Sequence, residues 1–79
     1  MKLQPVYIEW IDSSTLCGWK SPEQCVGEPI DLIRTLGILV HETNTTIVIS
    51  TSLSAWGNYC DPLFIPREAI KKFKKLKKL

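Results

Sequence analysis

The sequence predicts a mainly β protein built as one small five-stranded barrel. Short segments rich in β-branched and aromatic residues alternate with turn-forming residues, as the strands of a small sheet do. Pro66 ends one apolar segment, and the three residues after it are able to form a single 3₁₀ turn before Ile70 begins another segment. The chain has 79 residues, which is the size of a single small domain with a thin margin of stability.

The first predicted strand runs from Leu3 to Ile11. Val6, Ile8 and Trp10 alternate with residues of the opposite register, and the aromatic and branched content favours a strand. Asp12 and the hydroxyl residues after it end this alternation, because their side chains bond to nearby backbone groups. The sequence therefore predicts a long first loop.

One short helical turn is expected inside this loop. Ser21 is suited to the N-cap, Pro22 to the first helical position and Gln24 to the capping-box position. Gly27 follows shortly afterwards, so the helix is expected to be one turn and not a full element.

Two further strands are expected at 30–42 and 46–53, joined by a hairpin turn at 43–45. Gly37 lies in the middle of the first of them, where a barrel strand is expected to bend sharply. The run 47–49 is apolar on both faces, which indicates a strand that is buried on both sides or covered by a partner.

The chain is expected to end with a loop over 54–61, a fourth strand from Leu63 to Ile65, the 3₁₀ corner and a fifth strand from Ile70. Apolar residues recur every third position from Ile70 to Leu79, which suits neither strand alternation nor a long helix. One reading is a bulged edge strand whose lysines protect the edge against aggregation. A short amphipathic helix beginning near Glu68 is the alternative.

The charge of the chain is strongly asymmetric. The formal net charge is +2, yet residues 1–70 hold four Lys and Arg residues against eight carboxylates. The tail supplies the excess through Lys71, Lys72, Lys74, Lys75, Lys77 and Lys78. These six cations are expected to attract nucleic acid or an anionic membrane surface without sequence preference, or to act only as a solubilising tail.

Cysteine and histidine usage argues for a reduced protein without a metal or other cofactor. Cys17, Cys25 and Cys60 are odd in number and form no Cys-x-x-Cys pair, and His41 is the sole histidine. We expect reduced thiols in a cytoplasm, with the cysteines acting as small apolar fillers. With neither a disulfide framework nor a metal, self-association is the favoured source of extra stability.

No enzyme and no membrane-spanning protein is expected. A lone His41 has no nucleophile or paired carboxylate at a useful spacing, so catalysis is not predicted. The N-terminal residues lack the features of a signal peptide, and no stretch approaches the roughly 20 apolar residues of a spanning helix.

This order of strands resembles that of SH3-like or Sm-like small barrels. A narrower set of motifs resembles short proteins encoded by tailed bacteriophages: Trp10-x-Asp12-Ser13, Gly18-Trp19, Gly37-x-Leu39-Val40, Ile47-Val48-Ile49-Ser50 and Ile65-Pro66-Arg67. Some small phage proteins of this kind are anti-CBASS sponges, which sequester the cyclic dinucleotide signals of bacterial immunity. The resemblance implies a cyclic nucleotide ligand, a homo-oligomer and a place in the cytoplasm of a bacterial host.

Aromatic and charged loop residues are the main candidates for ligand contact. Trp19 and Trp56 lie beside glycines in irregular segments, where each is expected either to stack on a base or partner or to cap an open end of the barrel. Arg67 follows the proline corner and is a candidate phosphate ligand, although an ion pair with Glu68 or Asp61 explains it as well.

Polar residues at strand ends complete the candidate set. The carboxylate of Asp12, with Ser13 beside it, is suited to accept the N–H of a base edge, or else to form an Asx-turn. Ser52 belongs to a hydroxyl-rich segment that is able to donate to phosphate oxygens or to serve as polar strand surface. The predicted ligand-binding residues are thus Asp12, Ser13, Trp19, Ser52, Trp56 and Arg67.

Two binding functions follow from these features, and a purely structural phage component without a small ligand is a third possibility. The first is a non-enzymatic sponge that holds a cyclic nucleotide in a pocket between subunits of a homo-oligomer. The alternative is a small-barrel module that binds protein or nucleic acid, in which the basic tail makes the contact. Binding through the tail is expected to weaken steeply with added salt, whereas an enclosed pocket is expected to keep most of its affinity.

Overall fold

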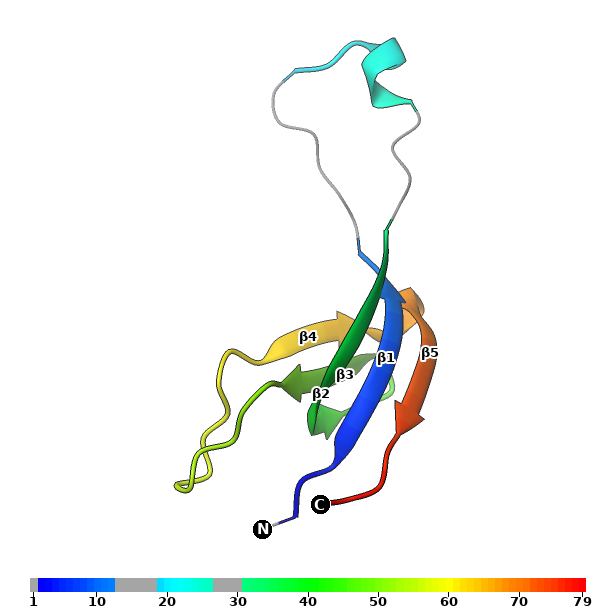
Figure 1. The fold of residues 1–79 in the computed structure, drawn as a ribbon. Helices are drawn as coiled ribbons and strands as arrows, with labels where there is room; N and C mark the ends of the chain where they lie inside the picture. The colour runs from blue at the N-terminus through cyan, green and yellow to red at the C-terminus, as the bar shows by residue number, and fades with distance from the viewer. Residues whose placement is uncertain (1, 13–18, 27–30) are drawn as a thin grey trace.

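The computed structural model describes residues 2–12, 19–26 and 31–79, which form one curved antiparallel sheet of five strands (Figure 1). The strands lie in the order β4-β3-β2-β1-β5. In chain order the elements are β1 (Pro5–Ile11), the 3₁₀ turn η1 (Pro22–Cys25), β2 (Leu32–Glu42), β3 (Thr46–Ser50), β4 (Leu63–Pro66), the 3₁₀ turn η2 (Arg67–Ala69) and β5 (Ile70–Lys75).

The mainly β class is confirmed, but the closed SH3-like barrel is not. β4 and β5 are the two edges of the sheet, and no pairing joins them. The predicted 3₁₀ corner after Pro66 is present as η2, and it connects these two edge strands. The sheet is therefore open between the strands that the corner links.

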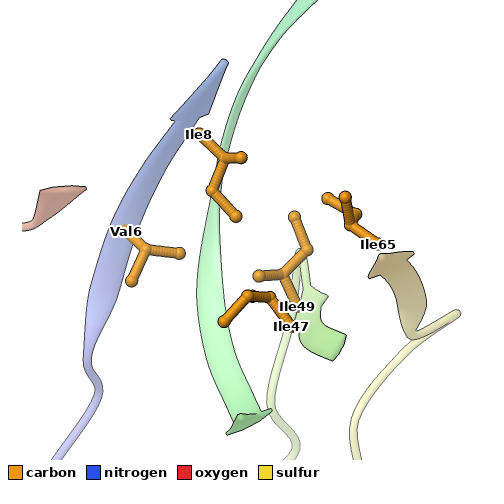
Figure 2. Packing of buried hydrophobic residues seen from close by; sticks show 5 residues of the cluster. All are labelled: Val6, Ile8, Ile47, Ile49 and Ile65. Carbon is orange, nitrogen blue, oxygen red and sulfur yellow. The ribbon is translucent and has the colours of Figure 1, made fainter. Parts of the chain in front are cut away.

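The core lies in the concave side of the sheet. Alternate residues of β1 and β3, together with one residue of β4, point toward one another there and are 0–2% exposed (Figure 2): Val6, Ile8, Ile47, Ile49 and Ile65. Burying a side chain of this size stabilises the fold by about 1.5–3 kcal/mol relative to leaving it exposed. The alternation of apolar residues in β1 therefore reflects the burial of only one face of this strand.

β2 is the long central strand that joins the two halves of the sheet. Its residues 32–38 pair with β1, and its residues 38–42 pair with β3. The register with β3 shifts between Leu39 and His41, two residues after the glycine at which the sequence predicts a bend. Gly37 instead lies where the backbones of β2 and β3 approach closely, because a Cβ there would be 3.2 Å from the carbonyl oxygen of Ser50.

The basic tail is an edge strand and not a helix, so the helical alternative is wrong. β5 pairs with β1, and its register shifts by one residue, since Trp10 faces Ile70 while Glu9 faces Lys72. This bulge explains the three-residue period, because it lets Ile70 and Phe73 both pack against the core. The lysines between them are exposed.

Two connections project from opposite ends of the sheet (Figure 1). The segment between β1 and β2 carries η1, in which the predicted capping box is present and the Ser21 N–H donates to Gln24 Oε1 over 3.0 Å. The segment between β3 and β4 leaves the sheet at the other end. The molecule is accordingly elongated, with extents of 52, 24 and 20 Å.

Strand boundaries differ from the prediction by a few residues. β1 begins at Pro5, β2 begins at Leu32 and β3 ends at Ser50 rather than at Leu53. At the end of β3 the buried Ser50 hydroxyl lies 2.5 Å from the Cys60 carbonyl oxygen and 3.0 Å from that of Ser52. Beyond Ser50 the regular pairing with β4 gives way to local hydrogen bonds, in which the Ser52 carbonyl also accepts the Cys60 N–H over 3.1 Å.

Candidate nucleic-acid interface

The strongest concentration of one charge in the described residues lies along β5 and the segment after it. We define the lysine edge as the exposed residues Lys71, Lys72, Lys74, Lys77 and Lys78. Lys75 differs from them, because its ammonium lies 2.7 Å from Glu42 Oε1. Within the part of the chain that the structure describes, it is the sole lysine of the tail with a carboxylate within 4 Å.

Backbone hydrogen bonds hold the lysine edge beyond the end of β5. The Leu76 N–H donates to the Pro5 carbonyl over 2.9 Å, and Leu79 and Leu3 exchange N–H···O bonds of 3.0 and 3.2 Å. Gln4 Nε2 also donates to the Leu76 carbonyl over 2.7 Å. The five lysines therefore project from an ordered backbone and not from a loose tail.

Glu9 of β1 and Glu42 of β2 are bound by residues that do not belong to the lysine edge. Glu9 lies 3.7 Å from the Arg34 guanidinium and accepts a hydrogen bond from the Tyr7 hydroxyl, which raises the pKa of that phenol. The hydrogen bond from Lys75 lowers the pKa of Glu42, and the positive charges of Lys75, Arg67 and His41 lower it further. Both carboxylates are thus partly neutralised by nearby cations.

Trp56 lies at the tip of a short hairpin that the sequence did not reveal as such. Leu53 and Tyr59 form an isolated bridge, and the Ser54 N–H donates to the Asn58 carbonyl over 2.9 Å. The Ser54 hydroxyl accepts the N–H groups of Trp56 and Asn58 over 3.3 and 3.1 Å. Trp56 itself is 92% exposed.

The sequence contains signals that identify this tip. Ser54 is a residue type whose side chain closes turns, and Gly57 has a φ of 86°, a left-handed conformation that favours glycine. A serine followed three residues later by glycine therefore predicts a tight turn that presents the residue between them. The capping alternative for Trp56 is wrong, since its indole does not cover the core.

The other predicted tryptophan is also fully exposed but lies at the opposite end. Trp19 is 102% exposed, in the segment that carries η1. Asp12 is exposed at the base of that segment, and its N–H donates to the Asp31 carbonyl over 3.3 Å. Ser13 lies outside the described residues. Trp10, one of the alternating residues of β1, packs against the core and donates from Nε1 to Thr35 Oγ1 over 3.1 Å.

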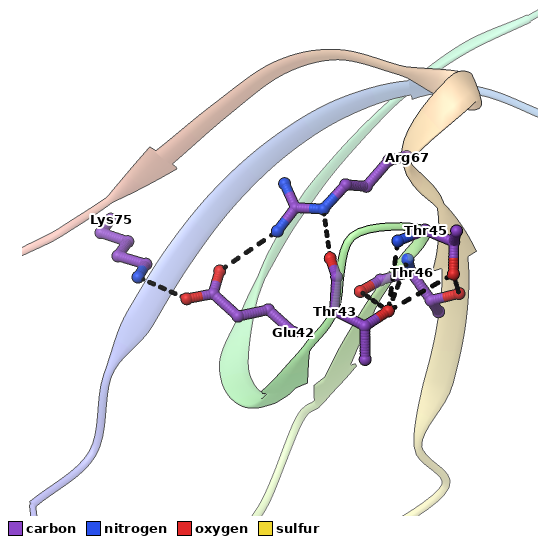
Figure 3. A network of polar contacts seen from close by, with 6 residues as sticks. All are labelled: Glu42, Thr43, Thr45, Thr46, Arg67 and Lys75. Carbon is purple, nitrogen blue, oxygen red and sulfur yellow. Dashed lines mark hydrogen bonds and ion pairs between the residues drawn. The ribbon is translucent and has the colours of Figure 1, made fainter.

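Arg67 is held in a polar network between η2 and the β2–β3 hairpin (Figure 3). Its Nε donates to the Thr43 carbonyl over 2.5 Å, and its Nη2 lies 3.6 Å from Glu42 Oε2. The ion pair is therefore made with Glu42, and not with Glu68 or Asp61 as the sequence suggested. These contacts hold the guanidinium against the hairpin.

We consider two hollows in the described part of the surface, and neither of them is lined by a predicted aromatic residue. A groove of about 350 Å³ is bounded by 44–46 and by Pro66, Arg67 and Glu68. A smaller hollow of about 70 Å³ lies beside Thr35, Ser50 and Asp61, well below the roughly 300 Å³ of a small-molecule site. Ser52 is exposed and lines neither hollow.

The five predicted ligand-binding residues that the structure describes are not gathered in one place of a single chain. Asp12 and Trp19 belong to one projecting segment, Ser52 and Trp56 to the other, and Arg67 to the network at η2. A ligand that touches all of them has to lie between copies of the chain. This set of residues stays a prediction.

The described cysteines are exposed, and no metal-binding cluster is found among the described residues. Cys25 and Cys60 are free and exposed, so neither acts as the apolar filler that the sequence predicted. Within the described ranges, no three His, Cys, Asp or Glu residues are close enough to hold a metal ion. Neither of the described 3₁₀ helices is long and apolar enough to cross a membrane.

Comparison with protein-family models, with curated proteins and with solved structures finds no match to this chain. The resemblance to short phage proteins and its implied nucleotide ligand therefore stay expectations.

Proposed function

We propose that this protein is a non-enzymatic interaction module that binds the phosphate backbone of nucleic acid through the lysine edge. The observation that carries the proposal is the order of that edge. Five lysines without a carboxylate partner among the described residues project from β5 and the segment after it, which hydrogen bonds hold to β1 and to Leu3. An ordered row of cations loses less conformational freedom on binding than a flexible tail does.

The distribution of acidic residues supports the same function. Residues 1–70 are net acidic, which by itself repels phosphate. Four of the eight carboxylates fall within positions 12–31, and the described part of that segment projects from the end of the sheet opposite to the C-terminus (Figure 1). Of the described carboxylates, Asp12, Glu23 and Asp31 therefore belong to the segment at the far end, whereas Glu9 and Glu42 lie on β1 and β2 and are paired with Arg34 and Lys75.

Fluorescence anisotropy with labelled oligonucleotides between 50 and 200 mM NaCl tests this proposal. Each lysine that neutralises a phosphate contributes about 0.7–0.9 to the slope of log K against log salt. We expect a Lys72→Gln/Lys74→Gln double variant to make this negative slope shallower by about 1.4–1.8 and to weaken binding at every salt concentration. Lys20→Gln, in the segment that carries η1, is the matched control and is expected to leave the slope unchanged. Absence of binding at 50 mM salt overturns the proposal.

The cyclic-nucleotide sponge remains a separate hypothesis, which needs a pocket between subunits. A thermal-shift screen against cyclic di- and trinucleotides tests it, because a ligand that binds only the folded state raises the melting temperature. A shift that persists at high salt supports an enclosed pocket, whereas no shift with any of them refutes the sponge.

A further inference from the structure

We propose that the ligand of this interface is a single-stranded nucleic acid and that the indole of Trp56 stacks on one of its bases. The inference rests on the proposed function and adds the class of nucleic acid and the residue that selects it. It depends on the construction of the hairpin tip, on its place relative to the lysine edge and on the chemistry of the indole.

The tip holds Trp56 in a fixed position. The Ser54 hydroxyl accepts the N–H groups of both Trp56 and Asn58, and the Gly57 N–H donates to the Ser54 carbonyl over 3.0 Å. At the root of the hairpin, the Cys60 N–H donates to the Ser52 carbonyl over 3.1 Å. A large apolar side chain that is exposed on a rigid turn is pre-organised for contact, because little backbone freedom is lost on binding.

The hairpin and the lysine edge open toward the same end of the molecule. In Figure 1 the segment between β3 and β4 and the C-terminal segment both lie at the end away from η1. Three strand spacings, about 14 Å, separate β5 from β3, at whose end the hairpin begins. The tip of the hairpin lies further out, and the longest dimension of the molecule, 52 Å, limits its distance from the lysine edge. A single strand of 15 nucleotides, at about 3.4 Å or more per nucleotide, is long enough to reach both features.

The indole distinguishes single strands from duplexes. Residues 53–59 of the hairpin carry no charged side chain, so the tip adds nothing to the attraction of phosphate. A flat aromatic ring gains binding energy by stacking on a free base, and this is worth roughly 1–3 kcal/mol per base. Paired bases inside a duplex are already stacked and do not offer their faces. The contribution of Trp56 is therefore expected for single strands and not for duplexes.

The experiment compares two exposed tryptophans at the two ends of the molecule. Trp56→Ala and Trp19→Ala remove indoles that are 92% and 102% exposed, so neither variant is expected to lose the fold, which circular dichroism checks. Binding is measured by anisotropy with labelled dT15 and with a dT15·dA15 duplex at 50 mM NaCl. Quenching of tryptophan fluorescence by dT15 is recorded in parallel.

We expect Trp56→Ala to weaken binding of dT15 by about 5- to 150-fold, which is the stacking energy converted to an affinity ratio. Binding of the duplex and the slope of affinity against salt are expected to stay unchanged. Trp56→Phe is expected to retain most of the affinity, since a phenyl ring also stacks. Trp19→Ala is expected to match the wild type with both oligonucleotides, because Trp19 is a candidate contact only of the cyclic-nucleotide hypothesis and lies at the end of the molecule away from this interface.

Three outcomes overturn the inference while leaving the proposed function intact. These are an equal effect of Trp56→Ala and Trp19→Ala on dT15, an equal loss for dT15 and duplex, and absence of fluorescence quenching in the wild type. If the wild type binds neither oligonucleotide at 50 mM salt, the proposed function itself fails and the inference fails with it.

Discussion

The ammonium of Lys75 lies 2.7 Å from Glu42 Oε1 and joins two strands that are not neighbours in the sheet. Lys75 ends β5, Glu42 ends β2, and β1 lies between these strands. Arg67 approaches the same carboxylate over 3.6 Å from η2 (Figure 3). A single acidic side chain therefore links three elements of a sheet whose edges do not pair.

Glu42→Gln is expected to lower the free energy of unfolding at neutral pH. The Lys75 hydrogen bond holds the pKa of Glu42 below its ordinary value of 4.5 in the folded state. A carboxyl group of this kind stabilises the fold above its unfolded pKa and loses that effect as pH falls through its folded pKa. The difference between wild type and variant, measured by urea unfolding, should therefore shrink below about pH 4.5 and disappear at lower pH. A difference that is constant with pH contradicts this account.

Gly37→Ala is expected to destabilise the sheet. Alanine reduces the conformational entropy of the unfolded chain, which alone would stabilise the fold, but the contacts around the new Cβ outweigh this effect. The new Cβ would lie 3.2 Å from the Ser50 carbonyl oxygen and 3.3 Å from Ile49 Cδ1. The isoleucine is able to rotate, but the backbone oxygen belongs to the paired strand β3 and moves only with it. We expect a loss of about 1 kcal/mol, at the low end of overpacking effects, measured by thermal or urea unfolding. An increase in stability would show that β3 yields easily.

Ser50→Ala is expected to loosen the root of the Trp56 hairpin. The Ser50 hydroxyl is buried, and its contact with the Cys60 carbonyl would be lost. Losing a hydrogen bond of this kind lowers the free energy of unfolding by about 0.5–1.5 kcal/mol. Hydrogen exchange of the amides in 51–60 should become faster. Ser52→Ala, which removes an exposed hydroxyl, should leave the free energy of unfolding and these exchange rates nearly unchanged. Equal effects of the two substitutions contradict the role of Ser50.

The amides of β4 are expected to alternate in hydrogen-exchange protection. The Arg67 N–H donates to the Thr45 carbonyl over 2.9 Å, so the antiparallel register directs the N–H groups of Ile65 and Leu63 toward β3. The Phe64 N–H then points away from the sheet, at an edge that Pro66 deprives of a further donor. NMR exchange should show the Phe64 amide at least about tenfold less protected than that of Ile65. Equal protection would reveal a second chain paired with β4.

Local pattern predicted much of this fold. The alternation in β1, the proline corner before η2, the capping box of η1 and the turn at 43–45 all depend on residues that are near one another in sequence. Their physical causes are the pleat of a strand, the missing proline N–H and short side-chain hydrogen bonds. These causes act before any distant contact forms.

The tail shows why local pattern was insufficient. Its three-residue period was compatible with a bulged strand, the favoured reading, and with a short helix. The pairing of Ile70 with Trp10 and of Phe73 with Ile8 decided between them. The same holds for the candidate ligand-binding residues, which are similar in type but lie at opposite ends of the molecule. The residues next to Trp19 and Trp56 do not indicate at which end of the sheet each tryptophan lies, because that depends on how the strands pair.

By itself, then, the sequence determined the β class, the position of most turns and the concentration of positive charge at the C-terminal end. Only the tertiary structure decided that β4 and β5 remain unpaired edges, that Lys75 is bound by Glu42 and that the other tail lysines project from an ordered strand. The reason is physical: secondary structure follows from local sterics and side-chain period, whereas register, edge exposure and ion pairing depend on contacts between residues that are far apart in sequence.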